Sequence, residues 1–289
     1  MGNGQWAEAL RSRIGYGGMH LSIDGRPGEA QSLSVLHAVL DAGVRLIDTA
    51  DVYCLDHTEI GHNERLIAKA LATWRGDRAS VLVATKGGLI RPQGRWVSKA
   101  DPRHLKAACE ASLRALGVER IGLYQLHAPD PAVPFPESVG ALADLKKEGK
   151  IEHAGLSNVS VEEIDEAGRI VPIASVQNRL NPFFREALRG GVVRHCDDHG
   201  LAFLAYSPVG GGRLNRKLPS HPALLPIARR HGASPHAVVL AWVRAQGRSV
   251  IPIPSARTVE HALDSFGSTS LELAAEDLAA IDRAEFEIR

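Results

Sequence analysis

Short apolar segments alternate with amphipathic segments along almost the whole chain. Most of the apolar segments run uninterrupted for about four or five residues, which is typical of strands buried on both faces of a parallel sheet. We therefore predict strands at these positions. They cover residues 14–19, 44–50, 80–88, 121–127, 152–158, 174–180, 201–207 and 249–255.

The amphipathic segments between these strands predict helices. Residues 31–43 place leucine and valine side chains on one stripe and end at Gly43, a favoured helix stop. Residues 101–117 begin with Asp101 as an N-terminal cap and Pro102 at the first helical position. The other predicted helices are residues 63–74, 137–150, 161–170, 185–200, 234–247 and 272–287.

This repeating order of strand and helix predicts the fold. Strands that alternate with helices, without a linker or a shift in composition, indicate a single (β/α)8 TIM barrel over residues 1–289. A doubly wound open sheet is the alternative. It is disfavoured because the nearest glycine run, Gly15 to Gly18, lacks the last glycine of GxGxxG and the acidic partner.

Composition narrows the class of protein. Hydrophobic residues make up 44% and charged residues 23%, as in ordinary globular proteins, and a formal charge of +1 gives no reason to expect a nucleic-acid partner. No apolar run is long enough for a membrane helix, and residues 1–13 lack the pattern of a signal peptide or a myristoylation site. Three cysteines without a CxxC pair favour the reducing cytoplasm.

Polar residues gather at the predicted strand ends. In a barrel these ends meet at one mouth, where the active site lies. Asp48, Lys86 and His127 end three successive strands, and Tyr53 follows Asp48 closely. Each alone has a simpler explanation: a helix cap, a solvated strand end or a structural histidine. Together the four side chains favour an active site.

The chemistry of these four side chains is coherent. A carbonyl that accepts hydride develops negative charge on its oxygen and needs a proton. Tyrosine, with an ordinary pKa of about 10, is a weak acid unless its phenolate is stabilised. A lysine ammonium held by an aspartate provides that stabilisation, and a histidine can orient the carbonyl or assist the proton transfer.

Six motifs at successive strand ends resemble the aldo-keto reductase superfamily, over nearly the whole chain. They are IDTADVY (47–53), ATK (84–86), QLH (125–127), GLSN (155–158), QN (177–178) and AYSP (205–208). The resemblance implies a nicotinamide-dependent carbonyl reductase on a (β/α)8 barrel. In it Tyr53 would be the general acid, Lys86 and Asp48 would set its pKa, and His127 would orient the carbonyl.

The resemblance also implies a cofactor site, more often for NADPH than for NADH. Ser157, Asn158 and Gln177 would hold the nicotinamide carboxamide, and Tyr206 would stack on the ring. Four residues of the following loop would wrap the pyrophosphate: Ser207, Val209, Gly211 and Arg213. The site of the 2′-phosphate departs from the usual pattern of the family, and here the candidates are Ser255, Arg257 and His261.

The substrate pocket would be built from three loops. The candidates are Met19 and His20 after the first strand, Cys54 within residues 54–62 after the second, and Trp96 after the third. Residues 54–62 are longer than the link that the family usually places there, so we expect substrate preference to depend on them. Trp96 would contact a ligand or pin its loop to the barrel. We expect Asn63 to cap the helix that follows.

Four other functions compete with carbonyl reduction. The same cofactor site would serve alcohol oxidation or enoyl reduction, although an acid in place of His127 would have favoured the latter. A cofactor-binding regulatory subunit, like the potassium-channel β subunits, is disfavoured because the chain begins so close to its first strand. A metal hydrolase is disfavoured because residues 51–62, although rich in Asp, Glu, His and Cys, contain no HxH or HExxH spacing. We therefore expect no metal.

Overall fold

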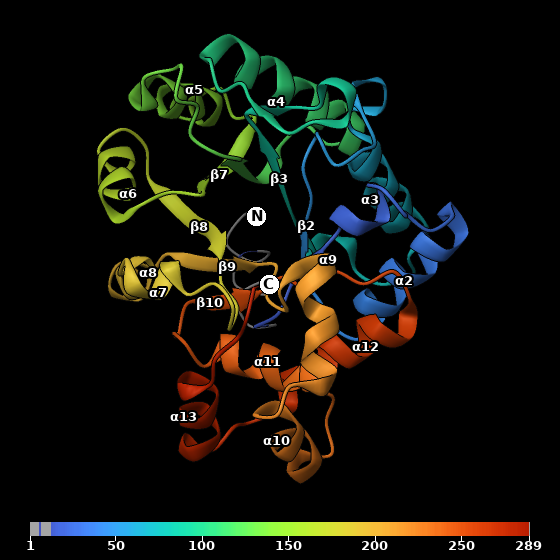
Figure 1. Cartoon of the computed structure of the whole chain (residues 1–289). Helices are drawn as coiled ribbons and strands as arrows, with labels where there is room; N and C mark the ends of the chain where they lie inside the picture. Colours follow the sequence, from blue (N-terminus) through green and yellow to red (C-terminus); the bar gives the residue numbers. More distant parts are fainter. Residues whose placement is uncertain (1–5, 7–12, 289) are drawn as a thin grey trace.

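Parallel strands form one curved sheet at the centre of the molecule (Figure 1). The computed structural model describes Trp6 and residues 13–288, and in that part of the chain the sheet has 8 strands in the order β1-β2-β3-β6-β7-β8-β9-β10. The strands are β1 (Tyr16–Gly17), β2 (Leu46–Asp48), β3 (Leu82–Gly87), β6 (Ile121–Leu126), β7 (Ile151–Ser157), β8 (Ile173–Arg179), β9 (Ala202–Tyr206) and β10 (Val250–Pro252).

The two ends of this sheet meet and close a barrel. The backbone N–H of Gly15 donates to the carbonyl of Pro252 at 2.9 Å, and that of Gly17 donates to Pro254 at 2.8 Å. These bonds join the first strand to the segment that carries the last one. The predicted (β/α)8 barrel is confirmed, and an open doubly wound sheet is ruled out by this closure.

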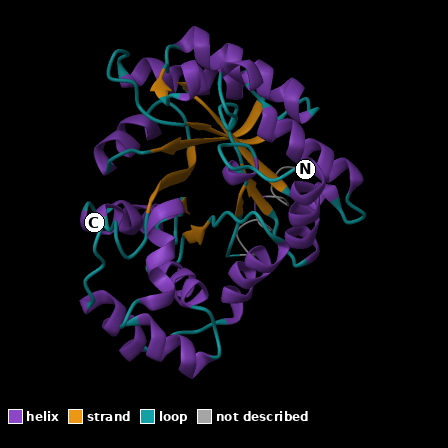
Figure 2. Cartoon of the chain, turned by 45° about the vertical axis from the view of Figure 1, so that its right-hand side comes forward, coloured by secondary structure: helices purple, strands orange, loops and turns teal. Residues whose placement is uncertain are grey.

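Helices surround the barrel on all sides (Figure 2). They are α2 (Glu29–Asp41), α3 (His62–Thr73), α4 (Pro102–Leu116), α5 (Phe135–Lys147), α6 (Val161–Gly168), α7 (Glu186–Arg189), α8 (Val192–His199), α9 (Gly211–Leu214), α10 (Leu224–His231), α11 (Pro235–Arg244), α12 (Val259–Gly267) and α13 (Ala275–Arg283). The cap predicted for α4 is present, since the Asp101 carboxylate accepts the N–H of His104 at 2.9 Å.

Three local predictions differ from the structure. The helix predicted over residues 185–200 is split into α7 and α8, because Gly191 adopts a φ of 74°. The loop after β3 contains an antiparallel hairpin, β4 (Leu89–Ile90) and β5 (Val97–Ser98). The expected cap Asn63 lies inside α3, whose N-cap is Gly61.

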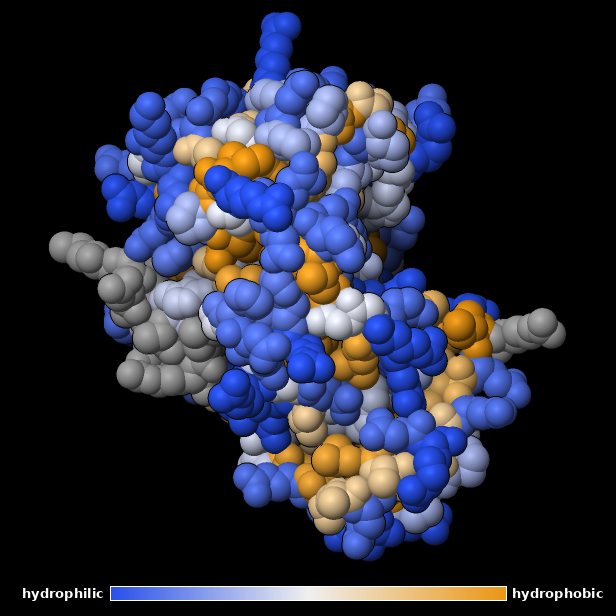
Figure 3. Space-filling view, turned by 90° about the vertical axis from the view of Figure 1, so that its left-hand side faces the viewer, coloured by the Kyte–Doolittle hydropathy of each residue, from blue (hydrophilic) through white to orange (hydrophobic). Residues whose placement is uncertain are grey.

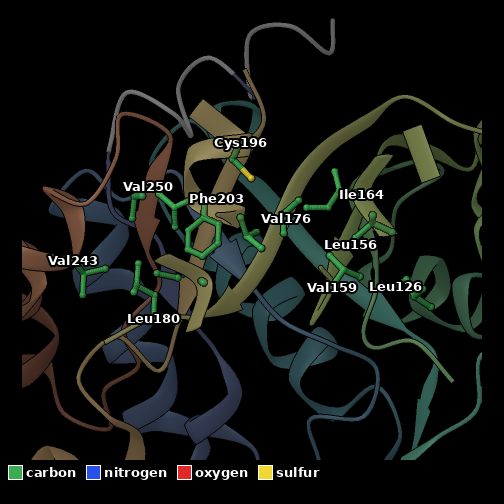
Figure 4. Packing of buried hydrophobic residues seen from close by; sticks show 14 of the residues in the cluster. Leu126, Leu156, Val159, Ile164, Val176, Leu180, Cys196, Phe203, Val243 and Val250 are labelled. Carbon is green, nitrogen blue, oxygen red and sulfur yellow. The ribbon is translucent and has the colours of Figure 1, made fainter. Parts of the chain in front are cut away.

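Side chains on the strands alternate between two cores. Leu46, Leu82, Leu123 and Leu204 fill the interior of the barrel. The residues between them along the strands face outward and pack under the helices, as Figure 4 shows for Leu126, Leu156, Val176, Phe203 and Val250. Because both faces of every strand are covered, the strands read as continuous apolar runs in the sequence.

The outer surface is mostly polar. On the face shown in Figure 3, apolar residues form small groups between hydrophilic ones. Within the described residues, no helix combines the length and the apolar character that crossing a membrane requires. The predictions about a signal peptide and about myristoylation concern residues 1–13, most of which lie outside the described residues.

Candidate active site

An ion pair lies at the C-terminal mouth of the barrel. Lys86 on β3 donates from Nζ to both carboxylate oxygens of Asp48 at the end of β2, at 2.8 and 2.7 Å. Its third acceptor is the carbonyl of Thr49, at 2.8 Å. Lys86 is fully buried and Asp48 nearly so. A buried ammonium surrounded by oxygen acceptors is held in one orientation, and the register of β2 against β3 sets that orientation.

The tyrosine predicted to act with this pair lies against it. The Lys86 Nζ donates to the Tyr53 hydroxyl at 3.1 Å and lies 5.0 Å from the centre of its ring. Tyr53 packs in a small apolar cluster with Ala50 and Val52. Burial raises the pKa of Tyr53 well above its usual range, and the nearby Asp48 carboxylate adds to the effect. The phenol therefore keeps its proton at neutral pH.

Lysine and tyrosine have pKa values that respond to burial in opposite directions. Burial lowers the pKa of Lys86, and the Asp48 carboxylate in contact with it acts against that shift. We expect the ammonium to stay charged, because Asp48 binds it with both oxygens and would otherwise be a buried charge without a partner. A charged Lys86 at 3.1 Å from the phenol oxygen stabilises the phenolate once the proton has left.

His127 follows β6 and completes the group of four. Its ring lies edge-on to Tyr53, with 5.8 Å between the ring centres. Its Nδ1 is buried and has no hydrogen-bond partner among the described residues. Burial lowers the pKa of His127 well below its usual range, and Lys86 contributes to that shift. The imidazole is therefore neutral and can donate from one nitrogen only.

Hydroxyl and amide side chains line the mouth beside these four residues. Gln177 on β8 donates to Asp48 at 2.7 Å, and Ser157 donates to the Gln177 carbonyl at 2.8 Å. Asn158, with a φ of 60°, donates to the His127 carbonyl at 2.9 Å and accepts from the Tyr206 hydroxyl at 2.8 Å. The four residues predicted to hold the nicotinamide are thus brought together next to the predicted catalytic residues.

The residues predicted to wrap the pyrophosphate follow β9. Ser207 has a φ of 48° and Gly211 one of 72°, so the chain turns sharply before α9. Val209 is half-buried against the main core. Arg213 on α9 is exposed and donates to the carbonyl of Ile288 at 2.5 Å, which explains why the end of the chain lies beside α9 in Figure 1.

The residues predicted for the 2′-phosphate lie between β10 and α12. The Ser255 hydroxyl is buried and lacks a hydrogen-bond partner among the described residues. Arg257 is exposed and donates to the carbonyl oxygens of His20 and Asp24, at 3.3 and 2.9 Å. His261 is exposed in the first turn of α12. Ser255 and Arg257 lie close together in the sequence. Contacts within the protein use only part of their capacity to donate hydrogen bonds.

The residues predicted to contact substrate differ in position. Met19 packs against the Tyr53 cluster at the mouth, while His20 faces Arg257. Cys54 is fully buried, and its Sγ donates to the carbonyl oxygens of Val52 and Asp56. Burial raises the pKa of this thiol to about 11. Its side chain therefore faces the interior of its own loop.

Trp96 lies over the predicted catalytic residues. Its ring centre is 6.2 Å from that of Tyr53 and 6.4 Å from that of His127, both edge-on, and 46% of the residue is exposed. On its other side the indole covers the guanidinium of Arg91, 3.9 Å from the ring centre. Arg91 was not predicted from the sequence. Its position in the loop between β3 and Trp96, a loop expected to contact substrate, was the available signal for a role at the site.

Two buried acids beside the site were also missed. Asp51 follows β2, and Glu64 lies in the first turn of α3 and accepts from Thr85 at 2.6 Å. Burial raises the pKa of both carboxyls, and the proximity of Glu64 adds to the shift of Asp51. Asn63 next to them joins the loops, since it accepts from Thr49 at 2.6 Å and donates to the Gly18 carbonyl at 2.9 Å.

Across Trp6 and residues 13–288, no group of three or more His, Cys, Asp or Glu side chains has a geometry that could hold a metal ion. In particular, the acidic residues of the 54–62 loop are used in other contacts. Asp56 caps the turn at Thr58, and Glu59 forms an ion pair with Arg26 at 2.8 Å.

Comparison with known sequences gives a consistent result. The model of the aldo/keto reductase family matches residues 13–285. An uncharacterised oxidoreductase of Schizosaccharomyces pombe is 32% identical over 276 residues, which are 94% of this chain and 86% of that protein. The aldo-keto reductase str7 of Strobilurus tenacellus is also 32% identical, over 95% of this chain and 89% of its own length.

Solved structures with the same fold include enzymes of the same kind. A glycerol dehydrogenase from Gluconobacter oxydans superposes with a TM-score of 0.81 at 28% identity, over 93% of this chain and 90% of that one. An aldo-keto reductase from Klebsiella pneumoniae, crystallised in complex with NADPH, superposes with a TM-score of 0.79 at 28% identity, over 94% of this chain and 90% of that one.

Proposed function

Because this chain belongs to the aldo/keto reductase family and is an oxidoreductase, we propose that it reduces the carbonyl group of a small aldehyde or ketone with NADPH. We also propose that residues 1–289 act as one domain, and that the protein works in the cytoplasm. The family match over residues 13–285 supports a single domain, and three buried cysteines without a disulfide support a cytoplasmic location.

The observation that carries the proposal is the contact between Lys86 and Tyr53, with Asp48 behind it. The Tyr53 hydroxyl donates its proton to the carbonyl oxygen as negative charge develops there. Lys86, aimed by Asp48, stabilises the phenolate that remains. His127, neutral and edge-on to Tyr53, orients the carbonyl oxygen by a hydrogen bond. In alcohol oxidation the same proton would travel in the opposite direction.

The side chains around the mouth fit a nicotinamide dinucleotide, which supplies the hydride when it is bound. Ser157, Asn158 and Gln177 offer hydroxyl and amide groups for its carboxamide, and Tyr206 offers an aromatic face beside them. The buried hydroxyl of Ser255, which lacks a partner within the described residues, fits a phosphate together with the Arg257 cation. Two crystal structures of aldo-keto reductase from Klebsiella pneumoniae, one with NADPH and one with NADP, support the choice of NADPH.

Replacement of Tyr53 by Phe tests the proposal. We expect Tyr53→Phe to lower the rate of NADPH-dependent reduction of 4-nitrobenzaldehyde by about 10²- to 10⁴-fold, because the general acid is lost while the ring remains. The affinity for NADPH, measured by fluorescence titration, should be the same in the variant as in the wild-type protein. Both proteins should bind NADPH more tightly than NADH. The rate is followed as NADPH absorbance.

Tyr124→Phe is the matched control for this experiment. Tyr124 is also buried, but its hydroxyl donates to the Leu105 carbonyl at 3.4 Å, in the core under the helices. We expect this variant to keep its activity. Full activity in Tyr53→Phe, or an equal loss in both variants, would refute the role of Tyr53.

A further inference from the structure

Arg91 is a buried cation that the proposed reaction does not use. Only 3% of the residue is exposed. Its Nη2 donates to the carbonyl oxygens of Cys54 and Leu55, both at 3.0 Å. Its Nε and Nη1 are buried and have no hydrogen-bond partner in the described part of the chain. A guanidinium has five N–H groups. Two of them have carbonyl acceptors, and the Cys54 thiol also interacts with the guanidinium.

Within the described residues, no carboxylate lies within ion-pair distance of this guanidinium. Lys86, the other buried cation near the mouth, is paired with Asp48. A guanidinium stays charged at any physiological pH, and burying it without a counter-charge is unfavourable. Two carbonyl dipoles and the face of Trp96 compensate Arg91 only in part.

Arg91 lies one side chain away from the predicted catalytic residues. The Trp96 indole covers its guanidinium at 3.9 Å, and the same indole lies edge-on to Tyr53 and His127, with 6.2 and 6.4 Å between ring centres. Trp96 is also the most exposed large side chain of this group, at 46%. A movement of the indole toward solvent would therefore leave the core closed and free one face of the guanidinium.

We propose that Arg91 binds the carboxylate of the substrate, so that the enzyme prefers carbonyl compounds that carry a carboxylate a few bonds from the reacting carbon. This inference rests on the proposed carbonyl reduction. Trp96 is displaced from the guanidinium face or packs on the body of the substrate between the carboxylate and the carbonyl. The alternative role of Arg91 is structural, because its Nη2 ties the loop at Cys54 and Leu55 to the β4–β5 hairpin.

A matched pair of substrates tests the proposal. 4-Carboxybenzaldehyde and methyl 4-formylbenzoate differ in charge but present the same aldehyde. We expect the unchanged enzyme to have a KM at least about tenfold lower for the acid than for the ester. Arg91→Met should remove this preference by raising the KM for the acid about 10- to 100-fold, with the ester unchanged. Arg91→Lys, which keeps the charge, should retain part of the preference.

The ratio of the two KM values separates binding from structure. A structural role would lower the activity toward acid and ester together and leave their ratio as it was. If the wild-type enzyme shows no preference for the acid over the ester, the carboxylate proposal is wrong. Reduction of the ester with NADPH would still support the proposed carbonyl reduction.

A binding measurement does not depend on catalysis. Benzoate, titrated calorimetrically in the presence of NADPH, should bind the unchanged protein at least about tenfold more tightly than Arg91→Met, and benzamide should not distinguish the two. If neither aldehyde is reduced, the proposed function fails and benzoate still decides the role of Arg91. Equal binding of benzoate by both proteins would reject the carboxylate site.

Discussion

At the scale of single residues, the mouth of the barrel buries more ionisable side chains than it pairs. Lys86 and Asp48 neutralise each other. Asp51 and Glu64 do not have such partners, and burial raises the pKa of both. The Oε2 atom of Glu64 lacks a hydrogen-bond partner among the described residues. Burial disfavours the ionised form of an acid in this position, so its ionisation at higher pH destabilises the folded state.

Glu64→Gln tests this account through the pH dependence of stability. The pKa of Glu64 is raised in the folded state, so the folded protein binds more protons than the unfolded one once the pH exceeds the ordinary value of 4.5. Stability conferred by this group is therefore present at low pH and lost as the pH rises. The amide cannot ionise, so the variant should lose less stability than the unchanged protein between about pH 5 and about pH 8, measured by urea unfolding.

The control for this substitution is Glu119→Gln, which makes the same chemical change at an exposed position before β6. It should follow the unchanged protein across the same pH range. Parallel curves for Glu64→Gln and the unchanged protein would show that Glu64 is ionised in the folded state despite its burial.

At the scale of elements, the helices with strong local signals were the ones that could be predicted. In α4, Asp101 caps the start, Pro102 follows and Gly117 ends the helix with a φ of 67°. The helices α9, α10 and α12 were not predicted. The first of them has only 4 residues, too few turns for a clear period. The β4–β5 hairpin was missed because each strand has 2 residues and its pairing depends on contacts made in the folded chain.

The cap of α4 gives a prediction at this scale. Asp101→Ala removes the acceptor of the His104 N–H and should lower the free energy of unfolding by about 1 kcal/mol. Asp101→Asn keeps an acceptor of the same shape and should lose only a small part of that. Urea unfolding of the three proteins measures the difference. An equal loss in both variants would mean that the carboxylate charge, rather than the capping hydrogen bond, stabilises the helix.

At the scale of the whole molecule, strand order explains why so much of the site was visible in the sequence. Parallel strands end at one mouth, so Asp48, Lys86 and His127 meet there although they lie far apart in the chain. Arg91 and Glu64 were not predicted, because a loop residue and a helix residue become buried only through tertiary contacts. Local pattern does not distinguish them from exposed charges of the same kind.

Closure of the barrel also depends on a glycine beside the site. Gly17 pairs with Asp48 on one side and donates to Pro254 at 2.8 Å across the closing seam. A Cβ on Gly17 would meet the backbone oxygen of Ile253 at 2.9 Å, and backbone cannot move aside as a flexible side chain can. The seam is therefore close enough that only glycine fits without a shift.

Gly17→Ala should accordingly force the seam apart and lower the free energy of unfolding by about 1–3 kcal/mol, the usual effect of overpacking. Activity should fall with stability, because Asp48 is the strand partner of Gly17 and aims Lys86. Gly140→Ala makes the same change within α5, where a Cβ would have no neighbour within 4 Å. That variant should instead be more stable by about 0.5–1 kcal/mol, because alanine favours a helix interior. In urea unfolding, the same glycine-to-alanine change should therefore lower the free energy of unfolding at Gly17 and raise it at Gly140. A stable and fully active Gly17→Ala variant would show that the barrel closes without this close contact.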